Sequence, residues 1–176
     1  TLVDITAGES HACAVDDAGK AYCWGEDNFG EVGNGSAGLT RVPVAVKSDG
    51  VLAGEVLVEI EAGQFNTCAL SDDGDVFCWG GWLGDGSGTT SQRPVRTDLS
   101  NITGGETPAS LHVAWDTPCL ITDAGHAYCW GSSYRGQTGT GKVTGSVLRP
   151  TPVVSDGVLD GVELTVLGRE ELRLVR

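Results

Sequence analysis

Residues 68–80 spell CALSDDGDVFCWG, and this stretch decides the fold because it occurs three times in the chain. The other copies are CAVDDAGKAYCWG, which starts at Cys13, and CLITDAGHAYCWG, which starts at Cys119. In each copy, two runs of β-branched, aromatic and small apolar residues flank a turn cluster of Asp, Ala and Gly, which is typical of a β-hairpin. Each copy therefore predicts two short antiparallel strands joined by a tight turn.

The turn sets which residues of each hairpin face each other. In the first copy, pairing Val15 with Ala21 and Asp16 with Lys20 leaves a three-residue loop that ends in Gly19, and a glycine recurs there in the other copies. Such a loop needs φ > 0 at that position, which glycine adopts at little cost. Counting outward places Cys13 and Cys23 in a non-hydrogen-bonded pair, whose Cα atoms lie about 4.5 Å apart. A disulfide can bridge this distance.

The same register predicts three local disulfides: Cys13–Cys23, Cys68–Cys78 and Cys119–Cys129. Two alternatives are six free cysteines that pack in the core and a zinc site. Zinc ligands are typically spaced two to four residues apart with histidine or further cysteines nearby, whereas nine residues separate the cysteines of each pair. Disulfides persist in oxidising compartments, so we expect an extracellular or cell-surface protein.

The composition excludes several classes of partner. The 176 residues carry a formal net charge of -13, and the 11 basic residues are scattered, which disfavours nucleic acid and anionic membranes. No stretch is long and apolar enough for a membrane span. No signal peptide precedes Thr1 and the chain has no methionine, so we expect a processed mature protein or a segment of a longer one.

The segments around each hairpin recur as well. A strand is predicted before each hairpin, at LVDITAG (2–8), VEIEAG (58–63) and SLHVAW (110–115), and a proline-containing edge strand after it, at RVPVAV (41–46), RPVRT (93–97) and RPTPVV (149–154). The tryptophans that end the hairpins, Trp24, Trp79 and Trp130, are 55 and 51 residues apart. Such a period is typical of propellers or solenoids.

These repeats predict an all-β fold of β-propeller blades, each with four short antiparallel strands. The predicted single repeat domain (1–176) divides into repeats at 1–50, 51–101 and 102–156 and the start of a fourth at 157–176. Both faces of the hairpin strands carry apolar or small residues, so the blades should stack with the tryptophans between them. About three and a half repeats give a partial propeller, or part of a larger or oligomeric one.

The order of motifs in AGESHACAVDDAGKAYCWGEDNFGEVGNG through Pro43 resembles the repeat of the regulator of chromosome condensation family. The resemblance covers nearly the whole chain and implies a propeller that usually has seven blades. The cysteine pair in each repeat is similar to a variant found in secreted bacterial members, one of which caps a β-lactamase as an inhibitor. The family's role in nucleotide exchange on chromatin depends on a basic surface, and its plant photoreceptor uses a glycine-tryptophan-arginine-histidine-threonine motif. This acidic chain has neither.

No segment carries a convincing catalytic or cofactor site. GQTGTGKVT, from Gly136, has the glycines and lysine of a phosphate-binding loop, but its glycines align with repeat glycines and Val143 replaces the Ser or Thr that binds magnesium. His11 is expected to form a turn hydrogen bond, and His126 is expected to be solvated. No nucleophile stands beside a base, so we expect no enzyme activity and no cofactor.

The acidic turns are a further candidate site. Those at Glu26, Asp72 and Asp85 could coordinate calcium, but none matches the alternating carboxylate loop with its distal Glu, so solvated surface is the better interpretation.

Protein binding has better candidates, in the variable loops after each Trp-Gly. These loops are expected to expose residue types that are enriched at interface anchors, namely Phe29, Trp82, Leu83, Tyr134 and Arg135. Alternatively, some of these rings fill gaps between blades.

The sequence therefore predicts a secreted, disulfide-stapled module for protein–protein interaction or extracellular assembly. Alternatives are an inhibitor-like propeller that caps a secreted enzyme, a metal-assisted hydrolase with an acidic loop site, and a purely structural array. Three and a half blades cannot close a ring alone, which leaves a longer chain, pairing of two copies, or a filament. Sheet edges expected at Leu2–Gly8 and Glu163–Val175 favour self-assembly into a homo-oligomer or filament.

Overall fold

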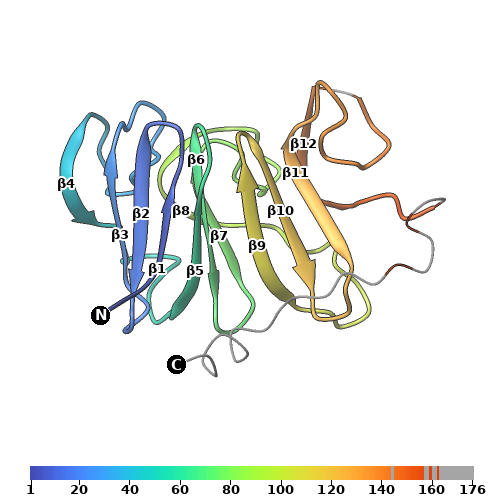
Figure 1. Cartoon of the computed structure of the whole chain (residues 1–176), viewed down its shortest axis with the longest axis horizontal. Helices are drawn as coiled ribbons and strands as arrows, with labels where there is room; N and C mark the ends of the chain where they lie inside the picture. The colour runs from blue at the N-terminus through green and yellow to red at the C-terminus, as the bar shows by residue number, and fades with distance from the viewer. Residues whose placement is uncertain (144, 157–158, 160–161, 163–176) are drawn as a thin grey trace.

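Twelve strands make up the part of the chain that the structure describes, which is residues 1–143, 145–156, 159 and 162 of a computed structural model (Figure 1). The strands are β1 Leu2–Ala7, β2 His11–Asp16, β3 Ala21–Gly25, β4 Thr40–Ala45, β5 Leu57–Ala62, β6 Asn66–Ser71, β7 Val76–Gly80, β8 Ser91–Arg96, β9 Pro108–Ala114, β10 Thr117–Thr122, β11 Ala127–Ser132 and β12 Ser146–Pro152.

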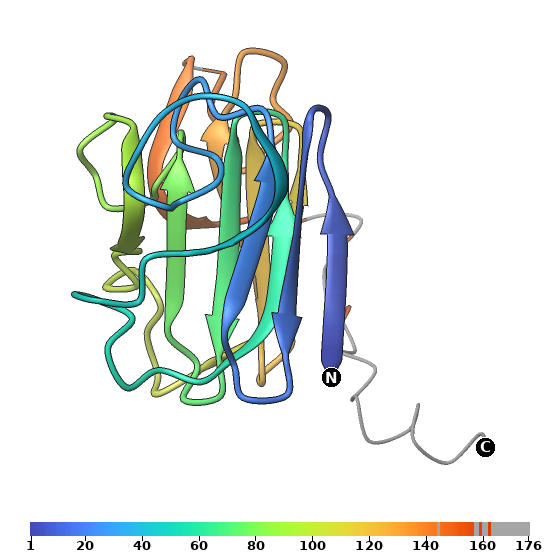
Figure 2. The same ribbon diagram turned by 90° about the vertical axis from the view of Figure 1, so that its left-hand side faces the viewer.

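The strands form three antiparallel sheets of four, ordered β1-β2-β3-β4, β5-β6-β7-β8 and β9-β10-β11-β12. Figures 1 and 2 show these sheets arranged one after another, as propeller blades are. This confirms the predicted all-β fold class. Each sheet lies within one predicted repeat, although the repeat boundaries themselves stay a prediction. The described residues contain no helix that could cross a membrane.

The hairpins have the predicted register. Cys13 pairs with Cys23 and Val15 with Ala21, and Gly19 closes the turn at a φ of 73°. The same arrangement recurs in the β6–β7 and β10–β11 hairpins. All three predicted disulfides are present, Cys13–Cys23, Cys68–Cys78 and Cys119–Cys129. Each cross-link ties the two central strands of one blade, so it braces that blade but does not join one blade to the next.

The core lies between blades. One apolar cluster joins the cysteine face of the first blade to Ile60, Phe77 and Trp79 of the second, and another repeats this arrangement between the second and third. Trp79 and Trp130 are fully buried at these junctions. The Trp79 indole donates a hydrogen bond to the Glu31 carbonyl (2.7 Å) across the first junction. The predicted packing of tryptophans between blades is therefore confirmed at both.

The first strands of the three blades lie next to one another. Asp4 of β1 accepts a hydrogen bond from the backbone N–H of Ile60 in β5 (2.9 Å), and Glu59 of β5 accepts one from Leu111 in β9 (3.1 Å). These acidic side chains satisfy backbone donors that no neighbouring strand pairs. They bring the turns that follow β1, β5 and β9 together at one end of the blades. The second predicted sheet edge, Glu163–Val175, lies outside the described residues.

Candidate functional site: the axial turns

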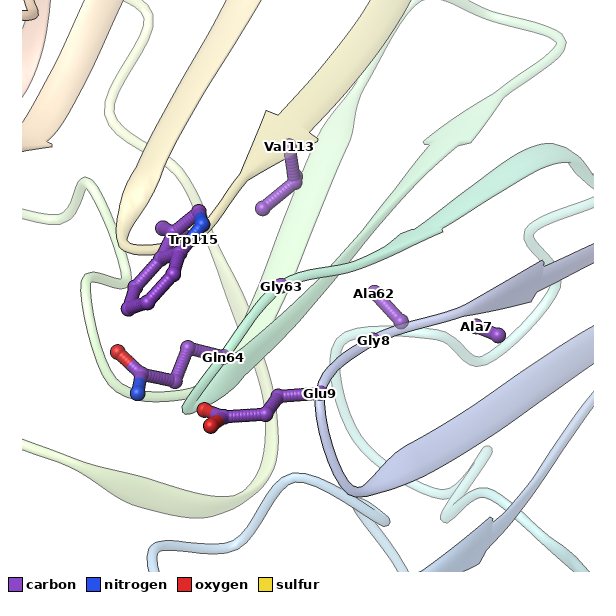
Figure 3. Close-up of a pocket in the computed structure, with 8 residues that line it drawn as sticks. All are labelled: Ala7, Gly8, Glu9, Ala62, Gly63, Gln64, Val113 and Trp115. Carbon is purple, nitrogen blue, oxygen red and sulfur yellow. The ribbon is translucent and has the colours of Figure 1, made fainter.

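The turns that follow β1, β5 and β9 line one cavity of about 330 Å³ (Figure 3). Its walls are the strand ends Ala7, Ala62 and Val113 and the turn residues Gly8, Glu9, Gly63, Gln64 and Trp115. The side chains of Glu9, Gln64 and Trp115 gather in a row in Figure 3, one from each blade. We call these three residues the axial row. Its members occupy the same repeat position, four residues before the first cysteine of each hairpin.

Backbone contacts hold the axial turns together. The Glu9 N–H donates to the Gly63 carbonyl (3.3 Å), and the Gln64 N–H donates to the Trp115 carbonyl (2.9 Å). A Cβ at Gly8 would lie 2.1 Å from the Gly63 oxygen, so only glycine permits this approach. These hydrogen bonds and close approaches run between neighbouring blades, so they fix the turns relative to one another.

Trp115 has an unusual conformation for a large side chain. Its φ is 53° and the residue is 71 % exposed. The backbone conformation follows from the turn: Ala114 pairs with Thr117, which leaves a two-residue hairpin loop. Such loops commonly need φ > 0 at the first central residue. A non-glycine residue in the left-handed region costs free energy, and such strain clusters at functional sites.

The electrostatics around the axial row are negative. Burial raises the pKa of Asp116, next to Trp115, and the charge of Glu9 raises it further, although a hydrogen bond from the Trp82 side chain opposes both effects. Oδ1 of Asp116 is buried and accepts no hydrogen bond. Exposed Glu9 has no ion-pair partner among the described residues. Two carboxylates thus repel each other here, and no ion pair within the described part of the chain offsets their charge.

A buried amide beside the axial turns also lacks partners. Asn66 is fully buried, and neither its oxygen nor its nitrogen makes a hydrogen bond within the described structure. The previous junction shows why: His11, at the equivalent position, reaches Thr67 of the next blade (2.8 Å). In the third blade Pro118 takes the place of Thr67 and has no hydroxyl to offer. A buried amide without hydrogen bonds costs free energy, so we expect a ligand or a water molecule to bond Asn66.

His11 corrects one prediction. Its ring does not bond within its own turn; it is buried between blades. The Thr67 hydroxyl donates to the Glu31 carbonyl (2.8 Å), so it accepts from Nε2–H of His11 (2.8 Å). Burial lowers the pKa of His11 to about 4. The ring is therefore neutral at pH 7 and serves the junction as a hydrogen-bond donor.

The loop residues predicted to bind a partner do not line the cavity. Phe29, Tyr134 and Arg135 are exposed, and Phe29 packs on Phe65 with ring centroids 4.9 Å apart. Trp82 is half-buried. The predicted exposure of Leu83 is wrong: this side chain is 3 % exposed and belongs to the core between the second and third blades.

The axial row was missed by sequence reasoning. A signal was present, because Glu9, Gln64 and Trp115 are three chemically different residues at one position of an otherwise repetitive turn.

The acidic loop after β3 also differs from expectation. Asp27 and Glu31, within and just after the EDN turn that begins at Glu26, are buried rather than solvated. Burial raises the pKa of both, against backbone hydrogen bonds that lower it. Glu31 accepts from the Phe29 N–H (2.8 Å), as Gln137 accepts from the Arg135 N–H (2.9 Å) in the third blade. Glu31 therefore accepts the same loop hydrogen bond that a neutral amide, Gln137, accepts in the third blade.

Neither metal nor phosphate chemistry has a built site in the described part of the chain. No group of three or more His, Cys, Asp or Glu side chains there is arranged to hold a metal ion. In the phosphate-loop-like segment, the Gly139 N–H bonds the Gly136 carbonyl (3.0 Å), as Gly33 bonds Gly30 in the first blade. The next element is strand β12, not a helix, so the segment is a repeat loop.

The comparisons with known proteins agree with this architecture. Residues 2–31 and 57–81 match the Regulator of chromosome condensation (RCC1) repeat. The chain contains repeats of the RCC1 type. These repeats are 31 % identical over 144 residues to the Ultraviolet-B receptor UVR8 of Arabidopsis thaliana, covering 80 % of this chain and 31 % of UVR8. They are 30 % identical over 161 residues to the E3 ubiquitin-protein ligase HERC2 of Homo sapiens, covering 88 % of this chain and 3 % of HERC2.

Solved structures share the RCC1-repeat fold. Human WBSCR16 superposes with a TM-score of 0.74 at 21 % identity, over 86 % of this chain and 37 % of that one. Prp20p from Saccharomyces cerevisiae gives 0.72 at 20 % identity, over 87 % and 38 %. The chain thus spans about a third or less of the length of these curated relatives, and under two fifths of these solved chains. The family resemblance inferred from the motif order is confirmed.

Proposed function

We propose that this chain is a non-catalytic, disulfide-stapled module of RCC1 repeats that binds a protein partner through the axial row. The observation that carries the proposal is the convergence of Glu9, Gln64 and Trp115, from three blades, around one cavity. Exposed tryptophan is among the residue types enriched at binding hot spots. The turns are fixed by backbone contacts, so a partner would meet a preorganised surface.

Known relatives support protein binding as the class of function. Prp20p has binding properties toward Gsp1p and histones, and a human relative is an X-linked retinitis pigmentosa GTPase regulator. HERC2 is a ligase, but this chain matches 3 % of it, so the match does not transfer catalysis. The described residues offer no metal-holding group that would support the hydrolase alternative.

We further propose an extracellular or cell-surface location. Three disulfides occupy all six cysteines. Structural disulfides persist in oxidising compartments and are rare in the cytosol. In protein isolated from its source under conditions that trap thiols, we expect no cysteine to react with a maleimide before reduction. Six reactive thiols would contradict the location.

Site-specific photo-crosslinking tests the binding proposal. A benzophenone amino acid at Gln64 should give a discrete adduct with a protein from the native surroundings, whereas the same group at exposed Ser87, on the loop before β8, should not. The proposal fails if both positions, or neither, give adducts. An adduct with a secreted enzyme that loses activity in the complex would favour the inhibitor-like alternative within the same class of function.

Self-assembly is a second candidate, favoured by the uncovered face of the first blade. Leu57 and Ile60 are 3 % and 0 % exposed because they pack against the preceding blade, whereas the equivalent Leu2 and Ile5 of β1 are 56 % and 65 % exposed. The exposed face of β1, which we call the end face, therefore resembles the apolar faces that meet at the blade junctions. No other blade of the described structure packs against it. An exposed patch of this kind marks an interaction surface or an aggregation hazard.

Light scattering tests assembly through the end face. The chain should form dimers or longer assemblies, and Ile5→Glu should convert them to monomers because it places a charge in the contact. Val143→Glu is the matched control, since Val143 is 70 % exposed on a distant loop and should leave assembly unchanged. A monodisperse wild-type monomer excludes self-assembly and leaves the axial-row proposal untouched.

A further inference from the structure

We propose that the cavity beside the axial row takes a basic side chain, lysine or arginine, of the protein partner. The inference rests on the proposed protein-binding function and specifies its chemistry. It joins three features of one place: an uncompensated negative field, a buried amide without partners and an exposed indole.

The charge is the first feature. Glu9 lines the cavity and has no ion-pair partner in the described structure. It lies close enough to Asp116 to oppose the ionisation of that half-buried carboxyl. A cation bound in the cavity beside Glu9 would offset this repulsion, whereas an anionic group would increase it. The negative charge beside the cavity therefore favours a positively charged ligand.

The second feature is a buried acceptor without a hydrogen bond, Oδ1 of Asn66, next to a glycine that lines the cavity. A Cβ built on Gly63, which lines the cavity, would lie 2.2 Å from Oδ1 of Asn66 and 2.2 Å from the Trp115 carbonyl. Both oxygens thus lie close to Gly63. The Trp115 carbonyl already accepts from the Gln64 N–H, whereas Asn66 is fully buried with no hydrogen bond of its own. An ammonium group has three donors and a guanidinium has five, so either can supply the donor that Oδ1 of Asn66 lacks.

The third feature is the Trp115 ring. It is held beside the cavity by a left-handed backbone, and the residue as a whole is 71 % exposed. Tryptophan is the best partner for a cation–π contact, because its ring face carries a negative quadrupole. The aliphatic stem of a lysine or arginine can pack along Ala62 and Val113 while its charged end meets the oxygens. A cavity of about 330 Å³ is of a size that accepts one such side chain.

Titration of the whole chain with short peptides tests the inference. The probe is a Gly/Ser peptide with one central lysine, and the control is the same peptide with that lysine acetylated. Binding is followed by the indole N–H resonance of Trp115, which is assigned by its loss in Trp115→Phe. The lysine peptide should shift this resonance in a saturable way, and the acetylated one should not. Equal shifts from the two peptides would overturn the inference.

A carboxylate variant adds a second, independent readout. Glu9→Gln keeps the side-chain size at an exposed position and should weaken binding of the lysine peptide by roughly 1.5- to 5-fold, the range of an exposed ion pair. Glu26→Gln, on the exposed loop after β3, is the matched control and should bind as the wild type does. Unchanged affinity in Glu9→Gln would also overturn the inference. If the crosslinked adduct from position 64 persists at full yield in Glu9→Gln, protein binding stands and the basic-side-chain pocket does not.

Discussion

Replacing His11 with glutamine should prevent a large part of the loss of stability that this protein undergoes as the pH falls from 8 to 4. The His11 ring is buried between the first two blades, and its Nε2–H donates to Thr67. Burial lowers its pKa from 6.5 to about 4. A proton therefore binds His11 more readily in the unfolded chain than in the folded one, so acid favours unfolding. Glutamine offers an N–H donor at this position and does not titrate.

The magnitude follows from linkage between the two pKa values. The contribution of the buried neutral ring is fully present above pH 6.5 and is lost as the pH falls toward 4. A difference of about 2.5 pKa units corresponds to roughly 3 kcal/mol in total. About 2 kcal/mol of this should be lost by pH 5. The raised pKa values of Asp27 and Glu31 act in the opposite direction, and the lowered pKa values of some surface aspartates act in the same direction as His11. These groups act equally in wild type and variant; the aspartates are Asp16, Asp49, Asp98 and Asp123.

Denaturant unfolding between pH 4 and 8, without reductant, measures this difference. The gap in unfolding free energy between wild type and His11→Gln should move by about 3 kcal/mol in favour of the variant as the pH falls. Thr67→Val removes the acceptor and keeps the imidazole, so it should destabilise at every pH while retaining the acid slope. The reasoning is refuted if wild type and His11→Gln lose stability in parallel.

Three further variants probe the packing of the blades, each by denaturant unfolding at pH 7. Gly63→Ala should lower the free energy of unfolding by about 1–3 kcal/mol, because its Cβ would lie 2.2 Å from a backbone oxygen. Gly81→Ala is the control and should lower it less, because its Cβ would meet nothing closer than 3.5 Å. Equal losses would contradict the argument that Gly63 is needed for close approach of the backbones. Glu31→Gln should raise the free energy of unfolding by up to about 1 kcal/mol, because burial raises the pKa of Glu31 and the amide keeps the loop hydrogen bond. A decrease in the free energy of unfolding would show that the charge of Glu31 stabilises the loop. Replacing Cys68 and Cys78 together with alanine should cost roughly 2–3 kcal/mol, as expected for closing a loop of about ten residues; a negligible change would show that packing alone sets the hairpin.

The repeated hairpin could be predicted from the sequence in detail because its determinants are local. The glycine at position 19 fixes the turn, the turn fixes the register, and the register places Cys13 opposite Cys23. Both faces of the hairpin strands carry apolar or small residues, so each face must be covered by a neighbouring sheet. These steps need no knowledge of distant contacts.

The axial site could not be predicted in the same way, because it is made by contacts between repeats. Nothing near His11 in the sequence shows that its partner is Thr67 of the next blade, 56 residues away. Leu83 illustrates the reverse error: its loop is variable, but the side chain turns into the junction between blades. Trp115 departs from the repeat pattern in the sequence, but only the structure places it beside Glu9 and Gln64.

The most direct test of the central claim is a hydrogen-exchange footprint of the complex with the partner captured by crosslinking. Our account predicts that binding slows amide exchange in the turns at 8–10, 63–65 and 115–116, and that Glu9→Gln weakens this protection. Protection confined to the variable loops after each Trp-Gly, or to the uncovered face of β1, would contradict the claim that the axial row binds the partner.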